Sequence, residues 1–310
     1  MIKNSLKVLF GNLGLVWKSL LYKLLCLFVS LGIASPLIVP VVVNLVKGGF
    51  FANLNNTVNN LVFNVNINSL FSSVKELALN FNQIVSQDNQ IALVVISLVL
   101  FVLVYYFFNS LLKHAVSGSI MTFMSSYAKT SFIGNYLTNF KRSVQLAFVK
   151  MITVLPLSCI NIVLTILIVI GLRTNPAGAV LVAIIFYTLF NSIKNTLFVG
   201  FENSVYIHNN SIYECFKNNI RIIKNKGIKI FSDNIFITLF SLLFNLMMIT
   251  FTVCAGLLIT IPLFMVFNAA YNSVIYYDYN GMRYYLDSNN IFTPKKLEEK
   301  DSFKKIKDII

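Results

Sequence analysis

The sequence predicts an all-α fold, a polytopic transmembrane helical bundle of about six spans with interfacial amphipathic helices. Of its 310 residues, 57% are hydrophobic and only 12% are charged, about half the charge of an average soluble domain. The hydrophobic residues gather in blocks long enough to cross a hydrocarbon layer of about 30 Å, which needs roughly 20 helical residues. Basic residues are concentrated in alternate segments between these blocks, as the loops of a multi-pass protein require.

Six blocks have the length and composition of membrane spans, namely 24–46, 91–112, 151–172, 178–198, 235–252 and 257–277. The last two are separated only by Cys254, Ala255 and Gly256, which predicts a tight helical hairpin. The alternative is one long bent helix. We therefore expect a single integral membrane domain over residues 1–287, followed by a charged cytoplasmic tail over 288–310.

The distribution of Lys and Arg predicts the orientation in the membrane. The four segments on one side hold four, five, five and seven basic residues, whereas the three on the other hold only Lys47, Lys75 and Arg173. Because cytoplasmic loops carry the excess of Lys and Arg, both termini are expected in the cytoplasm of a multi-pass cell-membrane protein. The net charge of +14 then fits anionic headgroups of the inner leaflet, worth ~1 kcal/mol per basic residue. Membrane lipids are the expected partners, and nucleic acid is not.

The long outer segment, 47–90, carries eleven asparagines but keeps apolar residues at spacings of three and four. This spacing predicts an amphipathic helix on the outer surface. The alternative is a partly disordered polar loop.

The inner segments share a plan in which a basic amphipathic helix precedes a pair of spans. Phe140 and Phe216 each precede a lysine by ten residues, at Lys150 and Lys226. This suggests three repeats starting near residues 1, 118 and 208; the alternative is a coincidence of composition.

The third basic helix is expected over 211–224. Ser211 and Glu214 match the capping box that satisfies backbone donors at a helix start, and Gly227 offers a stop. One face is apolar and the other basic, which is typical of a helix in the headgroup layer. A coupling helix that docks a partner protein would look the same. The basic face consists of Lys217, Arg221 and Lys224.

No catalytic, metal-binding or cofactor-binding motif is present, so no enzyme activity, metal or cofactor is expected. Phosphate-loop, nucleophile-elbow and zinc-protease patterns are all missing. The only histidines, His114 and His208, fall at the predicted inner membrane edge, where a solvated side chain is the usual outcome. The four cysteines form no C-x-x-C pair and are interpreted as small core residues.

Amides and one lysine form the candidate polar site. Asn191, Lys194 and Asn195 share one helical face, as do Asn268 and Asn272. Lys194 is the single charge expected within the spans. One interpretation is that these residues pair helices by hydrogen bonds or, for Lys194, reach the headgroups. The other is that spans four and six meet at an inner-leaflet cavity that receives a lipid phosphate or a small anion.

The C-terminal part resembles a loose group of bacterial membrane proteins. The final span runs into Tyr276, Tyr277 and Asp278 and then Arg283 and Tyr284, after a basic helix and hairpin. This arrangement resembles the membrane domain of membrane-anchored glycerophosphodiester phosphodiesterases over about 118–287. The run is interrupted by residues 279–282, and no catalytic domain follows. The resemblance therefore implies a membrane module without that activity.

The expected function is a non-enzymatic integral membrane protein of the bacterial cell envelope that interacts with lipids or a partner. The bacterial source is inferred from the abundance of Asn, Ile, Lys and Phe, which have A/T-rich codons. A protein partner or a homo-oligomer is compatible with this role. The alternative is a transporter or permease subunit that works with a separate ATPase, and a lipid-modifying enzyme is the third class.

Overall fold

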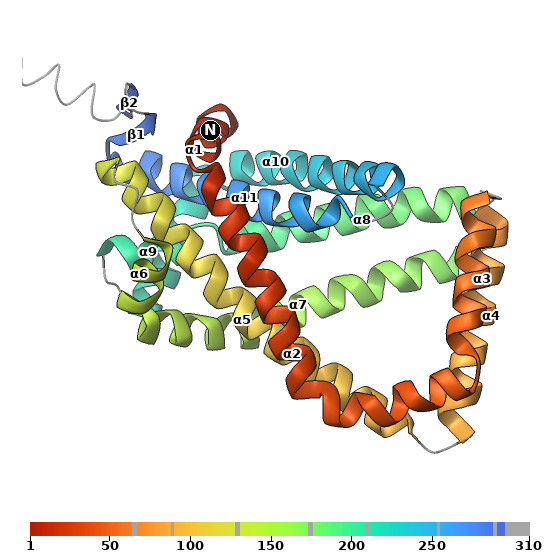
Figure 1. Cartoon of the computed structure of the whole chain (residues 1–310). Coiled ribbons are helices and arrows are strands. Elements are labelled where there is room, and N and C mark those ends of the chain that lie inside the picture. The colour runs from red at the N-terminus through yellow and green to blue at the C-terminus, as the bar shows by residue number, and fades with distance from the viewer. Residues whose placement is uncertain are drawn as a thin grey trace, which may run out of the picture. The chain divides into compact units, whose positions relative to one another are not determined.

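The computed structural model describes residues 1–63, 67–87, 90–127, 131–172, 176–208, 211–252, 255–287 and 290–294, and nearly all of them are helical (Figure 1). In chain order the elements are α1 (Ile2–Gly11), α2 (Leu13–Lys47), α3 (Phe50–Phe63), α4 (Ile67–Gln87), α5 (Ile91–Ser126), α6 (Phe132–Thr138), α7 (Phe140–Gly171), α8 (Pro176–Leu197), α9 (Phe201–His208), α10 (Ile212–Thr252), α11 (Leu257–Asn280), β1 (Tyr284–Asp287) and β2 (Asn290–Phe292).

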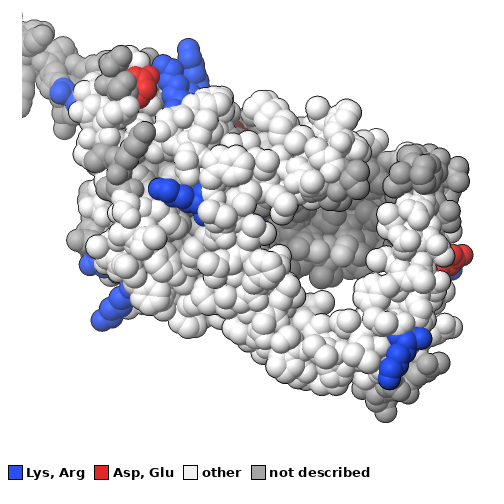
Figure 2. All heavy atoms as spheres, in the orientation of Figure 1, with Lys and Arg blue, Asp and Glu red and all other residues white. Residues whose placement is uncertain are grey.

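The predicted polytopic helical fold is confirmed. Within the described ranges, six stretches are long and apolar enough to cross a membrane: Leu13–Lys47, Ile91–Ser126, Phe140–Gly171, Ala177–Ile207, Ile212–Thr252 and Leu257–Asn280. Many large apolar side chains on these helices are exposed, and most of the described surface in Figure 2 is uncharged, with a few separate Lys, Arg and acidic side chains. A surface of this kind is suited to lipid rather than to water.

The two last spans form a helical hairpin, as predicted. α10 ends at Thr252 and α11 begins at Leu257. Three hydrogen bonds join the antiparallel pair, from the Thr260 hydroxyl to Asn245 (2.6 Å), from the Tyr271 hydroxyl to Asp233 (3.0 Å) and from the Asn225 amide to Tyr279 (3.2 Å). Residue 225 of α10 therefore lies level with the end of α11.

The prediction that the basic helix 211–224 is separate from span five is wrong. α10 continues through Gly227 for 41 residues, roughly 60 Å, which is twice the hydrocarbon thickness. A single interior glycine costs only about 1 kcal/mol. One buried face, which includes Cys215, Ile222, Ile230 and Ile237, continues across it and offsets that cost.

The helices pack as two compact units. One unit consists of Met1–Leu24, Phe107–Asn161 and Tyr187–Ile310, and its core surrounds α11. Against α11 lie α1, α9 and α10, and the Tyr277 hydroxyl donates to the carbonyl of Met121 on α5 (3.3 Å). The largest fully buried side chains include Tyr271, Tyr276 and Phe123. This unit contains the site described below.

After α11, the strands β1 and β2 form a small antiparallel hairpin that packs against α1. The sequence predicted only a charged tail from residue 288 and no strands. The Asn4 amide of α1 donates to the Tyr284 hydroxyl (3.1 Å), which donates to Asp278 (3.2 Å). Burial and then the Asp278 carboxylate raise the pKa of the Tyr284 phenol, so it stays protonated as a donor. The rest of the tail, 295–310, lies outside the described residues.

The second unit consists of Leu25–Tyr106 and Ile162–Phe186. Most of the described part of the asparagine-rich segment is helical, in α3 and α4, which lie side by side (Figure 1). Val41, Leu45 and Val85 form a small buried cluster, with Phe50 and Phe81 packed against it.

Candidate functional site

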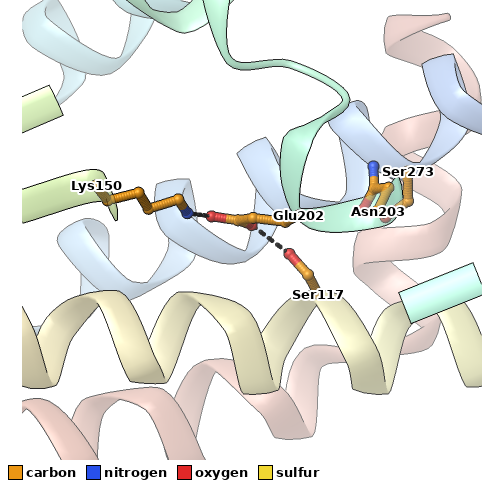
Figure 3. A network of polar contacts seen from close by, with 5 residues as sticks. All are labelled: Ser117, Lys150, Glu202, Asn203 and Ser273. Carbon is orange, nitrogen blue, oxygen red and sulfur yellow. Dashed lines mark hydrogen bonds and ion pairs between the residues drawn. The ribbon is translucent and has the colours of Figure 1, made fainter. Parts of the chain in front are cut away.

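A buried ion pair lies where α9 meets α5 and α7. Glu202 in the first turn of α9 pairs with Lys150 of α7 and accepts a hydrogen bond from the Ser117 hydroxyl of α5 at 2.6 Å (Figure 3). The side chains of Lys150 and Glu202 are only 9% and 13% exposed. The positive end of the α9 dipole also favours a carboxylate at this position. Each Glu202 oxygen therefore has a partner.

The next residue of α9 points to a different neighbour. Asn203 is fully buried, and its side-chain oxygen accepts from the Ser273 hydroxyl of α11 at 3.4 Å (Figure 3). Adjacent residues of one short helix thus connect to α5, α7 and α11. α9 therefore holds three other helices of the unit together through polar contacts.

The break between α8 and α9 is held by Asn219 of α10. The Gly200 backbone N–H donates to the Asn219 side-chain oxygen at 2.8 Å, and the Asn219 amide donates to the carbonyl of Leu197. A Cβ at Gly200 would lie 2.6 Å from Cδ1 of Ile222, so a larger residue here would have to displace the end of that side chain on α10. The break places Glu202 at the start of a new helix.

One face of α5 lines the site. Lys113 and Ser117 are four residues apart and share this face. The fully buried His114 ring lies 4.4 Å from the ring of Tyr206, centroid to centroid. Gly118 makes room for Tyr206, because a Cβ there would lie 2.4 Å from the end of its ring. His114 was expected to be solvated, and that expectation is wrong because α9 covers it.

The hydrogen bond that the structure describes for Lys194 is with α7. Its ammonium group donates to the Ser158 hydroxyl at 3.0 Å, and Ser158 donates to the carbonyl of Val154 at 2.9 Å. Lys113 lies within electrostatic range of Lys194 and Lys150, which repel it, and of the Glu202 carboxylate, which attracts it. Lys113 and Lys150 each lie one residue outside the predicted spans 91–112 and 151–172, so the sequence did not group them with Lys194. Lys194 belongs with Lys113, Lys150 and Glu202 to what we call the lysine cluster.

The amides predicted to join Lys194 are half-buried on α8 and α11. They are Asn191, Asn195, Asn268 and Asn272. Across the described ranges, no hydrogen bond joins the α8 pair to the α11 pair. α8 is instead linked to α10, through Ser192 with Thr238 (3.5 Å) and Asn234 with Thr196 (2.9 Å). Contact between spans four and six at these amides stays a prediction.

The basic side chains near the start of α10 are exposed. Lys217, Arg221 and Lys224 all lie on the open face of α10. The capping box is formed, because Ser211 N–H donates to the Glu214 carboxylate (2.9 Å) and Glu214 N–H donates to Ser211 Oγ (3.4 Å).

Sequence reasoning missed Glu202, Lys150 and Ser117 as site residues. A signal was present, because Glu202 is the only acidic residue between Asp88 and Glu214 and lies just after an apolar block. A solitary acid there is costly unless it is paired. The sequence did not indicate which lysine pairs with it.

Comparisons with known proteins add no relative. No family model, curated protein or solved structure matches the chain. The resemblance of residues 118–287 to a phosphodiesterase membrane domain therefore rests on the residues alone. Of these, Tyr276, Tyr277 and Tyr284 are buried in the core around α11.

The arrangement differs from a metal centre. Among the residues that the structure describes, no three His, Cys, Asp or Glu side chains gather closely enough to hold an ion. The chemistry that the lysine cluster offers is electrostatic and hydrogen-bonding.

Proposed function

We propose that this integral membrane protein is a non-enzymatic module of the bacterial cell envelope that engages anionic lipid headgroups on its lysine-rich side. The observation that supports this role is the exposed basic face of α10 beyond the end of α11. The lysine-rich side is the cytoplasmic one by the distribution of basic residues.

The α10–α11 hairpin sets the depth of the basic face. Because Asn225 bonds to Tyr279, the thirteen residues from 212 to 224 extend roughly 20 Å past the end of α11. Lys217, Arg221 and Lys224 lie on this extension, next to Tyr213, which is 77% exposed. With α11 across the bilayer, these groups reach headgroup level and the water beyond it. Anionic lipid is the occupant that matches their charge.

Purified full-length protein in mixed micelles of phosphatidylglycerol and phosphatidylcholine tests the proposal by native mass spectrometry. Removing the basic face with Lys217→Gln, Arg221→Gln and Lys224→Gln should lower the retained phosphatidylglycerol several-fold and flatten its salt dependence. A Lys47→Gln/Lys75→Gln variant, changed on the opposite predicted side, is the control. Equal retention by the α10 variant and the wild type would contradict the proposal.

Catalysis is the less favoured role for the lysine cluster. Ionisable groups do converge there, as a lipid-modifying enzyme would need. Both oxygens of Glu202 are engaged, by Lys150 and Ser117, which makes the carboxylate a poor general base. This pairing supports a binding role over acid–base chemistry.

A transporter subunit is the second candidate, favoured by the interrupted helix of α8 and α9. Broken helices that carry buried charge line substrate paths in many transporters. A separate ATPase would then copurify from native membranes at a stoichiometric ratio. Copurification of lipid without such a subunit would favour the lipid-binding module.

A further inference from the structure

The lysine cluster carries more positive than negative charge. α5, α7 and α8 supply the ammonium groups of Lys113, Lys150 and Lys194, and α9 supplies the carboxylate of Glu202. Lys150 forms an ion pair with one oxygen of that carboxylate, and the Ser117 hydroxyl donates a hydrogen bond to the other. In the part of the chain that the structure describes, neither Lys113 nor Lys194 forms an ion pair.

The position of the cluster makes this excess costly. Asn203 bonds to Ser273, which places the neighbouring Glu202 about seven residues, roughly 10 Å, inside the end of α11. Lys113 lies one further turn along α5 from Ser117, away from the Met121 contact with Tyr277. Unpaired ammonium groups at such a depth are unfavourable, and their mutual repulsion adds to the cost.

Three features indicate that the cluster could accept a ligand. The Lys113 side chain is exposed although its neighbours on α5 are buried. Lys194 uses one of its three donors on the neutral Ser158 hydroxyl, which neutralises no charge. Beside Lys113 in the chain, both ring nitrogens of the fully buried His114 lack a hydrogen-bond partner.

We infer that Lys113 and Lys194, backed by the Lys150–Glu202 pair, bind one phosphate-bearing group, from a lipid headgroup or from free phosphate. A phosphate offers several acceptor oxygens and one or two negative charges, which matches two lysines that form no ion pair among the described residues and share the single carboxylate of Glu202 with Lys150. The inference rests on the proposed lipid-binding function and assigns it a specific interior site. The site is distinct from the exposed basic face of α10.

Native mass spectrometry of the full-length protein tests the site under detergent conditions that strip loosely held lipid. The wild type should keep one phosphatidylglycerol, and a Lys113→Gln/Lys194→Gln variant should lose it at least tenfold more readily. Lys113→Arg/Lys194→Arg keeps the charge and should keep the lipid, which separates lost binding from lost folding. Lys47→Gln/Lys75→Gln is the matched control, because it removes two exposed lysines that lie outside both the cluster and the basic face of α10.

A second arm separates the two sources of phosphate. Inorganic phosphate added to delipidated protein should raise the thermal unfolding midpoint of the wild type, but not of Lys113→Gln/Lys194→Gln, if free phosphate is the ligand. Protection by phosphatidylglycerol micelles alone would identify the lipid. Equal lipid retention by all variants, with no protection by either probe, would overturn the site. If the α10 variant keeps its peripheral lipid while the cluster variant loses its single lipid, the proposed function of α10 fails and the interior site stands.

Discussion

At the scale of single residues, Glu202 matters because it is the one carboxylate in a cluster of cations. The cost of burying a charge is offset only while its partner is present. Lys150 provides the opposite charge and Ser117 provides a hydrogen bond, so the carboxylate has both. Removing one partner of the pair should therefore be worse than removing both.

This asymmetry gives a prediction for a double-mutant cycle. Glu202→Gln should lower the free energy of unfolding by about 3–5 kcal/mol, because it leaves the Lys150 ammonium buried without a counter-charge. Lys150→Met combined with Glu202→Leu should cost far less, because neither partner of the ion pair is then left buried without the other. Reversible unfolding in mixed micelles measures all four states of the cycle. A double variant less stable than Glu202→Gln would contradict this account of the pair.

At the scale of elements, the most informative feature is the break that separates α8 from α9. The span predicted here, 178–198, ends within one residue of the end of α8, and after a turn at residues 198–200 the structure begins a second helix, α9, which was not predicted. The interruption leaves backbone groups without helical partners, and Asn219 satisfies two of them. The orientation of Glu202 and Asn203 depends on this second helix start.

Asn219→Ala should therefore destabilise the start of α9 by more than the loss of one small side chain would suggest. It removes both bonds and leaves the Gly200 N–H and the Leu197 carbonyl without them, at a cost of about 1–3 kcal/mol. Hydrogen exchange of peptides covering 198–208 should accelerate. Asn225→Ala, which loses only an exposed bond to Tyr279, is the control and should leave that exchange unchanged. Unaltered exchange in Asn219→Ala would show that the break does not depend on this side chain.

At the scale of the whole molecule, the alternation of basic residues predicts which segments face the cytoplasm. Among the described residues, six helices are long and apolar enough to cross a membrane, which agrees with the predicted number of spans, and the orientation remains a prediction. It matters for function because the lysine cluster and the α10 extension both belong to the side assigned to the inner leaflet.

Single-cysteine labelling in a cysteine-free background tests the orientation in intact cells. Cysteines are introduced at the exposed positions Asn56, Thr138 and Ile220, of which only the first is predicted to face the outside. A membrane-impermeant maleimide should modify position 56 only, and positions 138 and 220 should react only after the cells are permeabilised. Modification of position 220 from outside would invert the topology and separate the basic face from the inner leaflet.

Much of the fold follows from local pattern. The six spans, the α10–α11 hairpin and the Ser211–Glu214 capping box are each set by residues close together in the chain, so the sequence by itself determined them. Hydropathy and capping act over one to a few helical turns, which is why they can be recognised without a tertiary structure.

The tertiary structure alone decided which polar residues meet. Lys150 and Ser117 lie 52 and 85 residues from Glu202 in the chain, and Asn4 lies 280 residues from Tyr284. Lys194 was predicted either to reach the headgroups or to line a cavity with the amides of spans four and six, and its described partner is Ser158 on α7. These pairings depend on how each helix is rotated about its own axis and on the break before α9. Both are set by packing among helices distant in the chain, because many rotations bury similar amounts of apolar surface and the buried polar groups select among them.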